Sequence, residues 1–201
     1  TPQNRPNEII VATEAGLYHS RDGGDSWPIS FGGLNSSERN VNVVKINPYR
    51  PNEVWIGTKG GLRISRDGGN TYNVANHRFV TRANIQWISF DPADPQKIYL
   101  GLDWSMGYSK DGGETYQIGF YNTYPALSNI RRIFIDPHHP ERILLGTNDG
   151  LMISLDGAKT FKRGGGLLFI GQPVVDLIQG FSPGHYLLAT EQVVARAKAL
   201  Y

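Results

Sequence analysis

The sequence predicts an all-β fold, a β-propeller made of four-stranded antiparallel blades. An eight-residue stretch, SRDGGDSW at 20–27, recurs as SRDGGNTY at 65–72, SKDGGETY at 109–116 and SLDGAKTF at 154–161, so its aspartates stand 45, 44 and 45 residues apart. Between the copies, short runs rich in β-branched and aromatic residues alternate with Gly, Pro, Asn and Asp, as strands and turns do. A fixed period of this length indicates stacked repeat units, and four short strands per period are typical of a propeller blade.

Each period has the same internal order. An apolar-rich first strand begins at Val41, Ile85 or Ile130, and a proline turn such as DPADPQK joins it to a second strand such as IYLGL. A glycine-bearing hairpin then leads to a third strand, which ends at the serine of the repeated stretch, and the fourth strand begins at its aromatic residue. We therefore expect one propeller segment over 1–201, with blades near 1–40, 41–84, 85–129, 130–172 and 173–201.

The two end blades are expected to be incomplete. The N-terminal NEIIVAT aligns with the second strand NEVWIGT, so no inner strand precedes it. At the other end, PVVDLIQGF and HYLLAT align with first and second strands. The tail EQVVARAKALY aligns with a third strand, although it also has helical spacing, and we interpret it as a strand.

About five blades are then present, as the arc of a larger ring or of one completed by another chain. Unpaired edges and apolar flanks invite a covering partner. We expect such flanks at Ile9 and Val11 at one end, and at Leu177, Leu187 and Leu188 at the other.

Composition and charge argue against several classes of protein. The chain has no cysteine, which excludes disulfides and thiolate metal sites. Its net charge is only +2 without a basic stripe, so nucleic-acid binding is not expected. No apolar run approaches the ~20 residues of a membrane span. His138 and His139 lack a carboxylate at a suitable spacing, so we expect no metal site, and no cofactor is implied.

The repeated stretch is better explained as a turn than as an active site. Its Asp and Ser side chains can accept hydrogen bonds from backbone N–H groups a few residues on, and its glycines permit positive φ. Four equal copies argue against a single asymmetric catalytic site. A calcium loop needs about six oxygen ligands, and each copy offers one carboxylate at a shared position.

The stretch resembles the Asp-box, or BNR repeat, S-x-D-x-G-x-T-W. The matching residues are Ser20, Asp22, Gly24 and Trp27 in the first copy; Ser65, Asp67, Gly69 and Tyr72 in the second; Ser109, Asp111, Gly113 and Tyr116 in the third; and Ser154, Asp156 and Phe161 in the fourth. The fourth copy has Ala158 where glycine is expected, so we expect that turn to be strained or reshaped.

The resemblance covers nearly the whole chain and implies a fold rather than one function. Asp-box propellers include sialidases, xyloglucan-cleaving glycoside hydrolases, sortilin-type receptors and photosystem assembly factors. The DPxxP turn followed by I/V-x-x-G-T looks most like the sortilin, xyloglucanase and photosystem-factor branch. The resemblance also implies an extracytoplasmic location, and a binding face opposite the boxes.

Two sets of loops are expected on that binding face. The second-to-third-strand hairpins carry Glu14, Lys59, Asp103, Asp149 and Glu191, and the third adds Trp104. The blade-to-blade loops carry aromatic and basic residues. Because exposed aromatics and arginines mark interfaces, we predict a contact surface made of Trp104, Asp103, Tyr121, Tyr124, Arg78 and Arg82.

The expected function is a noncatalytic binding module or assembly factor that recognises a protein partner. The alternative is a glycoside hydrolase of the xyloglucanase-like or sialidase-like class, with carbohydrate as ligand and Asp103 and Asp149 as the two carboxylates. For a sialidase, Arg39, Arg78 and Arg82 could supply the arginines, but the (F/Y)RIP motif is absent. On the inner strands, Trp87, Arg132 and Asp176 could line a channel or pack between blades through an Arg132–Asp176 pair.

Overall fold

The computed structural model describes residues 5–30, 32–75, 77–119, 129–164, 170–180, 185–191 and 194–198. These residues form five antiparallel sheets and one short 3-10 helix, η1 (Ser36–Glu38). The all-β propeller prediction is confirmed: each sheet is one blade, and the blades have three, four, four, four and three strands.

The three complete blades share one strand order. Blade 2 contains β4 (Val41–Ile46), β5 (Val54–Thr58), β6 (Gly61–Ser65) and β7 (Asn73–Val74). Blade 3 contains β8 (Ile85–Phe90), β9 (Ile98–Leu102), β10 (Met106–Ser109) and β11 (Gln117–Gly119). Blade 4 contains β12 (Arg132–Ile135), β13 (Ile143–Thr147), β14 (Gly150–Ser154) and β15 (Lys162–Arg163).

The end blades have three strands each. Blade 1 contains β1 (Ile9–Thr13), β2 (Gly16–Ser20) and β3 (Ile29–Ser30), which correspond to second, third and fourth strands. Blade 5 contains β16 (Val174–Gln179), β17 (His185–Thr190) and β18 (Val194–Lys198), which correspond to first, second and third strands. The strand interpretation of the C-terminal tail is therefore confirmed over 194–198.

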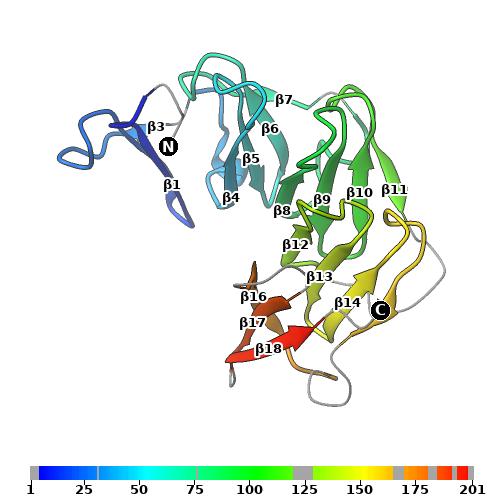
Figure 1. The fold of residues 1–201 in the computed structure, drawn as a ribbon. Coiled ribbons are helices and arrows are strands. Elements are labelled where there is room, and N and C mark those ends of the chain that lie inside the picture. Colours follow the sequence, from blue (N-terminus) through cyan, green and yellow to red (C-terminus); the bar gives the residue numbers. More distant parts are fainter. Residues whose placement is uncertain are drawn as a thin grey trace.

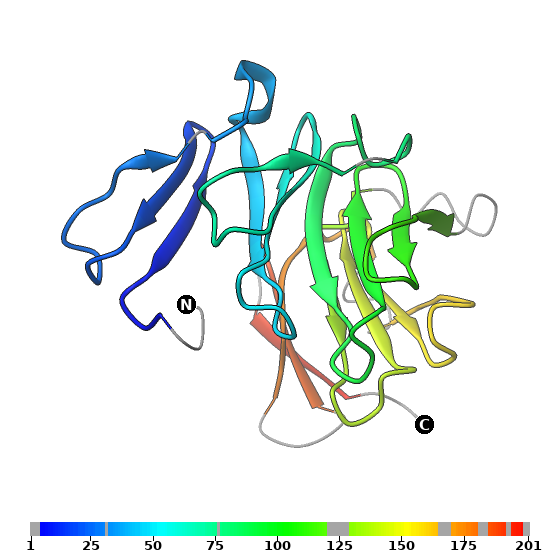
Figure 2. The same cartoon turned by 90° about the horizontal axis from the view of Figure 1, so that it is seen from above.

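The blades are arranged as an open arc (Figure 1), and the view from above shows them standing side by side (Figure 2). The first strands β4, β8, β12 and β16 contact one another in turn along the concave side. Blades 1 and 5 form the two ends of the arc.

The four repeated stretches are turns held by the same hydrogen bonds. In the second copy, Ser65 Oγ donates to Asp67 Oδ1 (2.7 Å) and accepts from Gly69 N (2.8 Å). Asp67 also accepts from Thr71 N (2.9 Å) and from Thr71 Oγ1 (2.5 Å). The other three copies have the equivalent bonds. The repeated residues thus close a turn within eight positions.

The fourth turn keeps this geometry and is strained rather than reshaped. Ala158 N still donates to Ser154 Oγ (3.0 Å), and Ala158 has φ of 68°, in the left-handed region. In the third turn a Cβ at Gly113 would lie 2.9 Å from the Tyr116 hydroxyl and 2.3 Å from Trp55. Phe161 has no hydroxyl, and the residue equivalent to Trp55 is the smaller Tyr99, so a methyl group fits at 158.

Adjacent blades are joined through apolar faces. In blades 2, 3 and 4, two second-strand residues and the aromatic residue of the turn are buried against the preceding blade; they are Val54, Ile56 and Tyr72, then Ile98, Leu100 and Tyr116, then Ile143, Leu145 and Phe161. The equivalents in blade 1 are Ile9, Val11 and Trp27. Val11 is 38% and Trp27 40% exposed, because no described blade precedes them.

One part of the expected C-terminal flank is wrong. Leu177 and Leu188 are buried, since they pair across β16 and β17 and point back into blade 4, where they pack with Leu144 and Leu151. Alternation along a strand places their neighbours on the outer side. Ile178 is the exposed residue of that flank, and Leu187 is half-buried.

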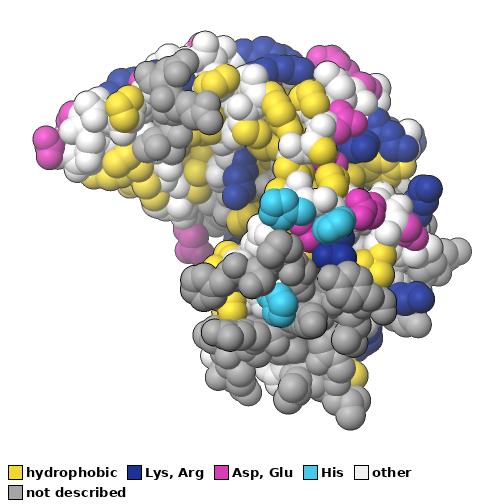
Figure 3. Space-filling view, in the orientation of Figure 1, with side chains coloured by type: hydrophobic (Ala, Val, Ile, Leu, Met, Phe, Trp, Pro, Cys, Tyr) yellow, Lys and Arg dark blue, Asp and Glu magenta, His cyan; other side chains and the backbone are white. Residues whose placement is uncertain are grey.

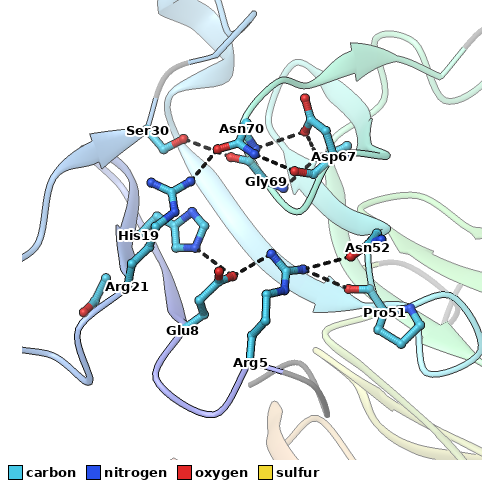
Figure 4. Close-up of polar contacts among 12 residues, drawn as sticks. Arg5, Glu8, His19, Arg21, Ser30, Pro51, Asn52, Asp67, Gly69 and Asn70 are labelled. Carbon is cyan, nitrogen blue, oxygen red and sulfur yellow. Dashed lines mark hydrogen bonds and ion pairs between the residues drawn. The ribbon is translucent and has the colours of Figure 1, made fainter.

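Polar contacts reinforce the junction between blades 1 and 2 (Figure 4). Arg5 reaches Asn52 Oδ1 and the Pro51 carbonyl at 3.4 Å, and it pairs with Glu8 at 2.8 Å. Glu8 Oε2 lies 3.4 Å from the buried His19 ring, whose pKa is lowered mainly by burial and then by Arg21. These contacts fix the orientation of the end blade relative to its neighbour.

Candidate functional site

The hairpins and the repeated turns lie on opposite faces of the arc. In an antiparallel blade, the second-to-third and third-to-fourth connections leave from opposite ends of the third strand. The hairpin face therefore carries the loops at 14–15, 59–60, 103–105 and 148–149, together with the loops between blades. The second-to-third-strand hairpins therefore lie on the face opposite the repeated turns, as the sequence predicts.

A polar pocket of 510 Å³ lies at the hairpin end of the concave side. We call it the mouth pocket. Blades 1 to 5 all contribute to it, and its lining residues are Ala12, Thr13, Glu14, Asn40, Val41, Asn42, Lys59, Asn84, Gln86, Arg131, Arg132 and Val175. Three of these side chains are cationic, four are amides on the first strands or just before them, and one is a carboxylate. The pocket therefore favours an anionic or hydrogen-bond-accepting ligand.

Bulges at the start of the first strands aim side chains into this pocket. The register shifts between Val41 and Val43, between Ile85 and Trp87, and between Val174 and Asp176. The extra residues are Asn42, Gln86 and Val175, and all three line the pocket.

Hydrogen bonds hold the two amides in place. Asn42 Nδ2 donates to Asn84 Oδ1 (2.8 Å) and to the Ile85 carbonyl (2.9 Å), and Gln86 Nε2 donates to Asn129 Oδ1 (3.3 Å). Sequence reasoning missed both residues. Both are amides at the second position of their first strand, where blades 4 and 5 have Arg131 and Val175, and this shared position was the available signal.

A row of stacked side chains lies beneath the pocket, along the inner strands. The Lys45 ammonium lies 4.2 Å and the Arg132 guanidinium 4.4 Å from the Trp87 ring centroid. Arg132 Nε also donates to Asp176 Oδ1 (3.2 Å), so the expected Arg132–Asp176 pair is present. Burial and nearby Arg132 lower the pKa of Lys45. These contacts hold the side chains of the row in place. Two cations against the one carboxylate of Asp176 leave the concave side beneath the pocket net positive.

The blade 3 hairpin presents Trp104 beside the mouth pocket. Ser105 Oγ donates to the Gly119 carbonyl (2.7 Å), and Asn129 N donates to the Asp103 carbonyl (2.7 Å). Trp104 is 46% exposed at the tip of the hairpin. Asn129 also accepts from Gln86, so this hairpin is linked to the pocket through hydrogen bonds.

The other predicted site residues are less closely grouped. Arg78 and Arg82 are exposed on the loop between blades 2 and 3, where Arg78 stacks on Phe79 at 4.5 Å. Asp103 and Asp149 are half-buried on neighbouring hairpins, and neither lines the mouth pocket. Tyr121 and Tyr124 lie outside the described residues.

A larger groove of 1010 Å³ lies between blades 3 and 4 on the opposite face. Four carboxylates line it, and each has a partner. Asp94 Oδ2 lies 3.4 Å from Lys97 Nζ, and Glu141 Oε1 lies 3.4 Å from His139 Nδ1, while Asp91 and Asp156 are engaged in turns. Asp91 Oδ1 accepts from Ala93 N (2.9 Å), and Asp156 Oδ1 accepts from Thr160 N (2.9 Å). The mouth pocket is therefore the better candidate site, although it is smaller.

The described residues contain neither a metal-binding cluster nor a membrane-spanning helix. No group of three or more His, Asp or Glu side chains in this part of the chain could hold a metal ion. Within the same residues, no helix is long and apolar enough to cross a membrane.

The comparisons with known proteins show the fold. No family model matches the chain, and no curated protein sequence matches it. Among solved structures, it is similar to an ancestral GH74 enzyme, with a TM-score of 0.78, 22% identity, and coverage of 94% of this chain and 26% of that one. For the GH74 xyloglucanase from Xanthomonas campestris, the TM-score is 0.72, with 16% identity and coverage of 93% and 32%.

The chain is also similar to YCF48 from Cyanidioschyzon merolae. That match has a TM-score of 0.68 and 16% identity, and it covers 96% of this chain and 64% of that one. The chain thus spans about a quarter to a third of the GH74 enzymes and less than two thirds of YCF48. These proteins place it in the β-propeller fold class, which includes both enzymes and proteins not described as enzymes.

Proposed function

We propose that the chain is a noncatalytic Asp-box propeller segment that binds a protein partner through its hairpin face. The mouth pocket carries this proposal. It combines Lys59, Arg131 and Arg132 with four amide side chains on or just before the first strands, against the single carboxylate of Glu14. Arg132 is already paired with Asp176, so Arg131 and Lys59 supply the charge for a ligand. Guanidinium groups bind carboxylates in a bidentate manner, so an acidic segment of a protein is the ligand that fits.

The blade 3 hairpin supplies an apolar anchor beside this charge. Exposed tryptophan and arginine side chains contribute most binding energy at protein interfaces. We therefore assign Trp104, Asp103, Arg78 and Arg82 to the outer part of the same contact surface. Tyr121 and Tyr124 follow in the loop after blade 3 and are proposed to extend it.

A glycoside hydrolase is the weaker proposal. Such an enzyme needs two carboxylates about 5 to 9.5 Å apart at the bound sugar. The mouth pocket has one carboxylate, and Asp103 and Asp149 stand outside it. The sequence resemblance to the sortilin, xyloglucanase and photosystem-factor branch supports the Asp-box assignment and an extracytoplasmic location.

A titration with a short glutamate-rich peptide tests the proposal. Arg131→Gln should weaken its binding about tenfold, which corresponds to ~1.4 kcal/mol, and about 0.5 M salt should weaken it further by screening. Trp104→Ala should weaken binding of a protein partner by about 2 kcal/mol. Arg163→Gln, on the exposed outer strand β15, is the matched control and should change nothing.

Two results would contradict the proposal. The first is equal affinity for the peptide and for its glutamine counterpart, since the pocket would then not recognise charge. The second is hydrolysis of xyloglucan, measured as release of reducing sugar ends, if Asp103→Asn or Asp149→Asn abolishes this activity. That result would assign the hydrolase instead.

A further inference from the structure

An arginine crosses from blade 1 to the repeated turn of blade 2. A methyl group added at Gly68, in that turn, would collide with the Arg5 guanidinium. Arg5 Nη2 also donates to Asn52 Oδ1 at 3.4 Å, as Figure 4 shows. The space in front of the turn glycine is therefore filled by a guanidinium, and an amide side chain of blade 2 accepts a hydrogen bond from it.

The junction of blades 2 and 3 repeats this arrangement. Arg50 occupies the position of Arg5, because RPNE at 50–53 aligns with RPNE at 5–8. A Cβ added at the turn glycine Gly112 would lie 3.1 Å from Arg50 Nη2 and 3.0 Å from Gln96 Oε1. Here too, an arginine of one blade and an amide of the next meet over the turn.

The junction of blades 3 and 4 lacks the arginine. The aligned segment is DPQK at 94–97, so Asp94 stands where the first two blades have arginine. Asp94 pairs within its own turn, since its Oδ2 atom lies 3.4 Å from Lys97 Nζ. A methyl group added at Gly157, the matching turn glycine, would meet no atom within 4 Å. The space that a guanidinium fills at two junctions is therefore open at the third.

This open space belongs to the 1010 Å³ groove on the face of the repeated turns, which Asp94, Glu141 and Gly157 line. Glu141 occupies the position of Asn52 and Gln96. In all three blades the turn glycine donates its N–H to the carbonyl of this residue, at 2.9, 2.9 and 2.8 Å. The acceptor beside the arginine is thus kept in blade 4, but it is a carboxylate instead of an amide.

The charged groups already in the groove leave room for a cation. Four carboxylates and three ammonium groups line it: Asp91, Asp94, Glu141, Asp156, Lys97, Lys110 and Lys159. The Lys110 ammonium lies 5.4 Å from the Tyr108 ring centroid, and Lys159 is exposed. Asp94 and Glu141 form only exposed ion pairs, which contribute little free energy. Figure 3 shows acidic and basic side chains intermixed over blades 3 and 4.

We infer that an arginine side chain of a protein partner binds in this groove, in the place that Arg5 and Arg50 occupy at the other two junctions. A planar guanidinium pairs with carboxylates through parallel hydrogen bonds, and Asp94 and Glu141 are the acceptors. Tyr99 and Tyr108 also line the groove, and aromatic rings attract guanidinium groups. The groove is a second contact surface, on the face opposite the mouth pocket and for a ligand of opposite charge.

Two peptides test whether the groove recognises the charge. The probe is a capped Gly-Arg-Gly peptide, and its control contains citrulline, which has the shape of arginine without the charge. In an NMR titration, the arginine peptide should shift the Gly157 and Ala158 amide signals saturably at millimolar concentration. The citrulline peptide should bind at least tenfold more weakly, and about 0.5 M salt should weaken binding of the arginine peptide by screening.

A matched pair of substitutions locates the acceptor. Glu141→Gln removes the charge and leaves the amide that blade 3 has at Gln96, and it should weaken binding of the arginine peptide about fivefold or more. Glu114→Gln makes the same chemical change on a 77% exposed side chain that does not line the groove. It should leave the affinity unchanged.

A double variant supplies the missing arginine from the chain itself. Asp94→Arg combined with Lys97→Glu restores the arginine and glutamate positions of RPNE, so the new guanidinium should occupy the groove. This variant should melt at a higher temperature than the wild type and should no longer bind the arginine peptide. Competition by the chain's own side chain is specific to this site.

Several outcomes would overturn the inference. Equal affinity for the arginine and citrulline peptides would show that charge is not recognised, and absence of shifts at Gly157 and Ala158 would exclude the groove. Unchanged peptide affinity in the folded double variant, checked by circular dichroism, would place the peptide elsewhere. If the double variant does not fold, equal affinities of wild type and Glu141→Gln are sufficient to reject the site.

Discussion

Tyr186 Oη donates a 2.5 Å hydrogen bond to Asp136 Oδ2, although 50 residues separate the two side chains in the sequence. Arg142 Nη1 donates to the same carboxylate oxygen at 3.1 Å, and all three residues are buried. Burial raises the pKa of Tyr186 to about 12, so the hydroxyl remains a donor at neutral pH. The network joins the first turn of blade 4 to the second strand of blade 5.

Tyr186→Phe is expected to destabilise the chain by about 1–3 kcal/mol, the usual effect of removing a buried hydrogen bond to a charged group. Urea unfolding measures it. Tyr49→Phe is the matched control, because Tyr49 Oη donates to the Asp91 carbonyl (2.8 Å) from a 40% exposed ring. Equal effects of the two substitutions would show that burial of the network contributes nothing.

Asp67→Ala should loosen the second repeated turn and leave ligand binding intact. The carboxylate accepts four hydrogen bonds within its own turn, from Ser65, Asn70 and twice from Thr71. Because it is exposed, the expected loss is at the low end, about 1 kcal/mol. A melting scan and a peptide titration check both parts. Unchanged stability with lost binding would reassign the turn as a binding site.

Acid should destabilise the fold through these turns. Hydrogen bonds from Thr71, Thr115 and Thr160 lower the pKa of Asp67, Asp111 and Asp156 from 3.8 to about 2. A carboxyl with a depressed folded pKa stabilises above its unfolded pKa, and this contribution is lost as pH falls from about 4 towards 2.

Asp67→Asn should make this pH dependence shallower by about one proton, as measured by unfolding free energies at several pH values. Thr71→Val keeps the carboxyl but removes its strongest hydrogen bond, so it should move the transition to higher pH. An identical pH profile for wild type and Asp67→Asn would contradict the linkage.

Ala158→Gly should stabilise the fourth turn. Ala158 has φ of 68°, where an L side chain is strained by roughly 1–2 kcal/mol. Lost packing and higher unfolded-state entropy offset part of the gain, so the expected net effect is about 0.5 kcal/mol. Gly157→Ala introduces the same strain at φ of 70° without a steric contact and should lower the melting temperature. A lower melting temperature for Ala158→Gly would show that the methyl contact dominates.

The sequence by itself determined the repeat, the strand order and the turns. These features depend on local chemistry: Ser65, Asp67 and Thr71 satisfy each other within seven positions, and Ala158 predicted a strained or reshaped turn before any contact was known. The same local period also aligned the N-terminal strand with the second strands of the other blades. Such signals need only the residues within one blade.

Only the tertiary structure decided which side chains face a neighbour and which line the site. Leu177 and Leu188 were assigned to an open flank, yet they are buried, because burial depends on blade 4, more than 20 residues away in sequence. Asn42 and Gln86 reach the mouth pocket because of bulges, which the alternating pattern does not reveal. The pocket itself exists because curvature brings five blades together, and that curvature arises from packing between blades rather than from any single repeat.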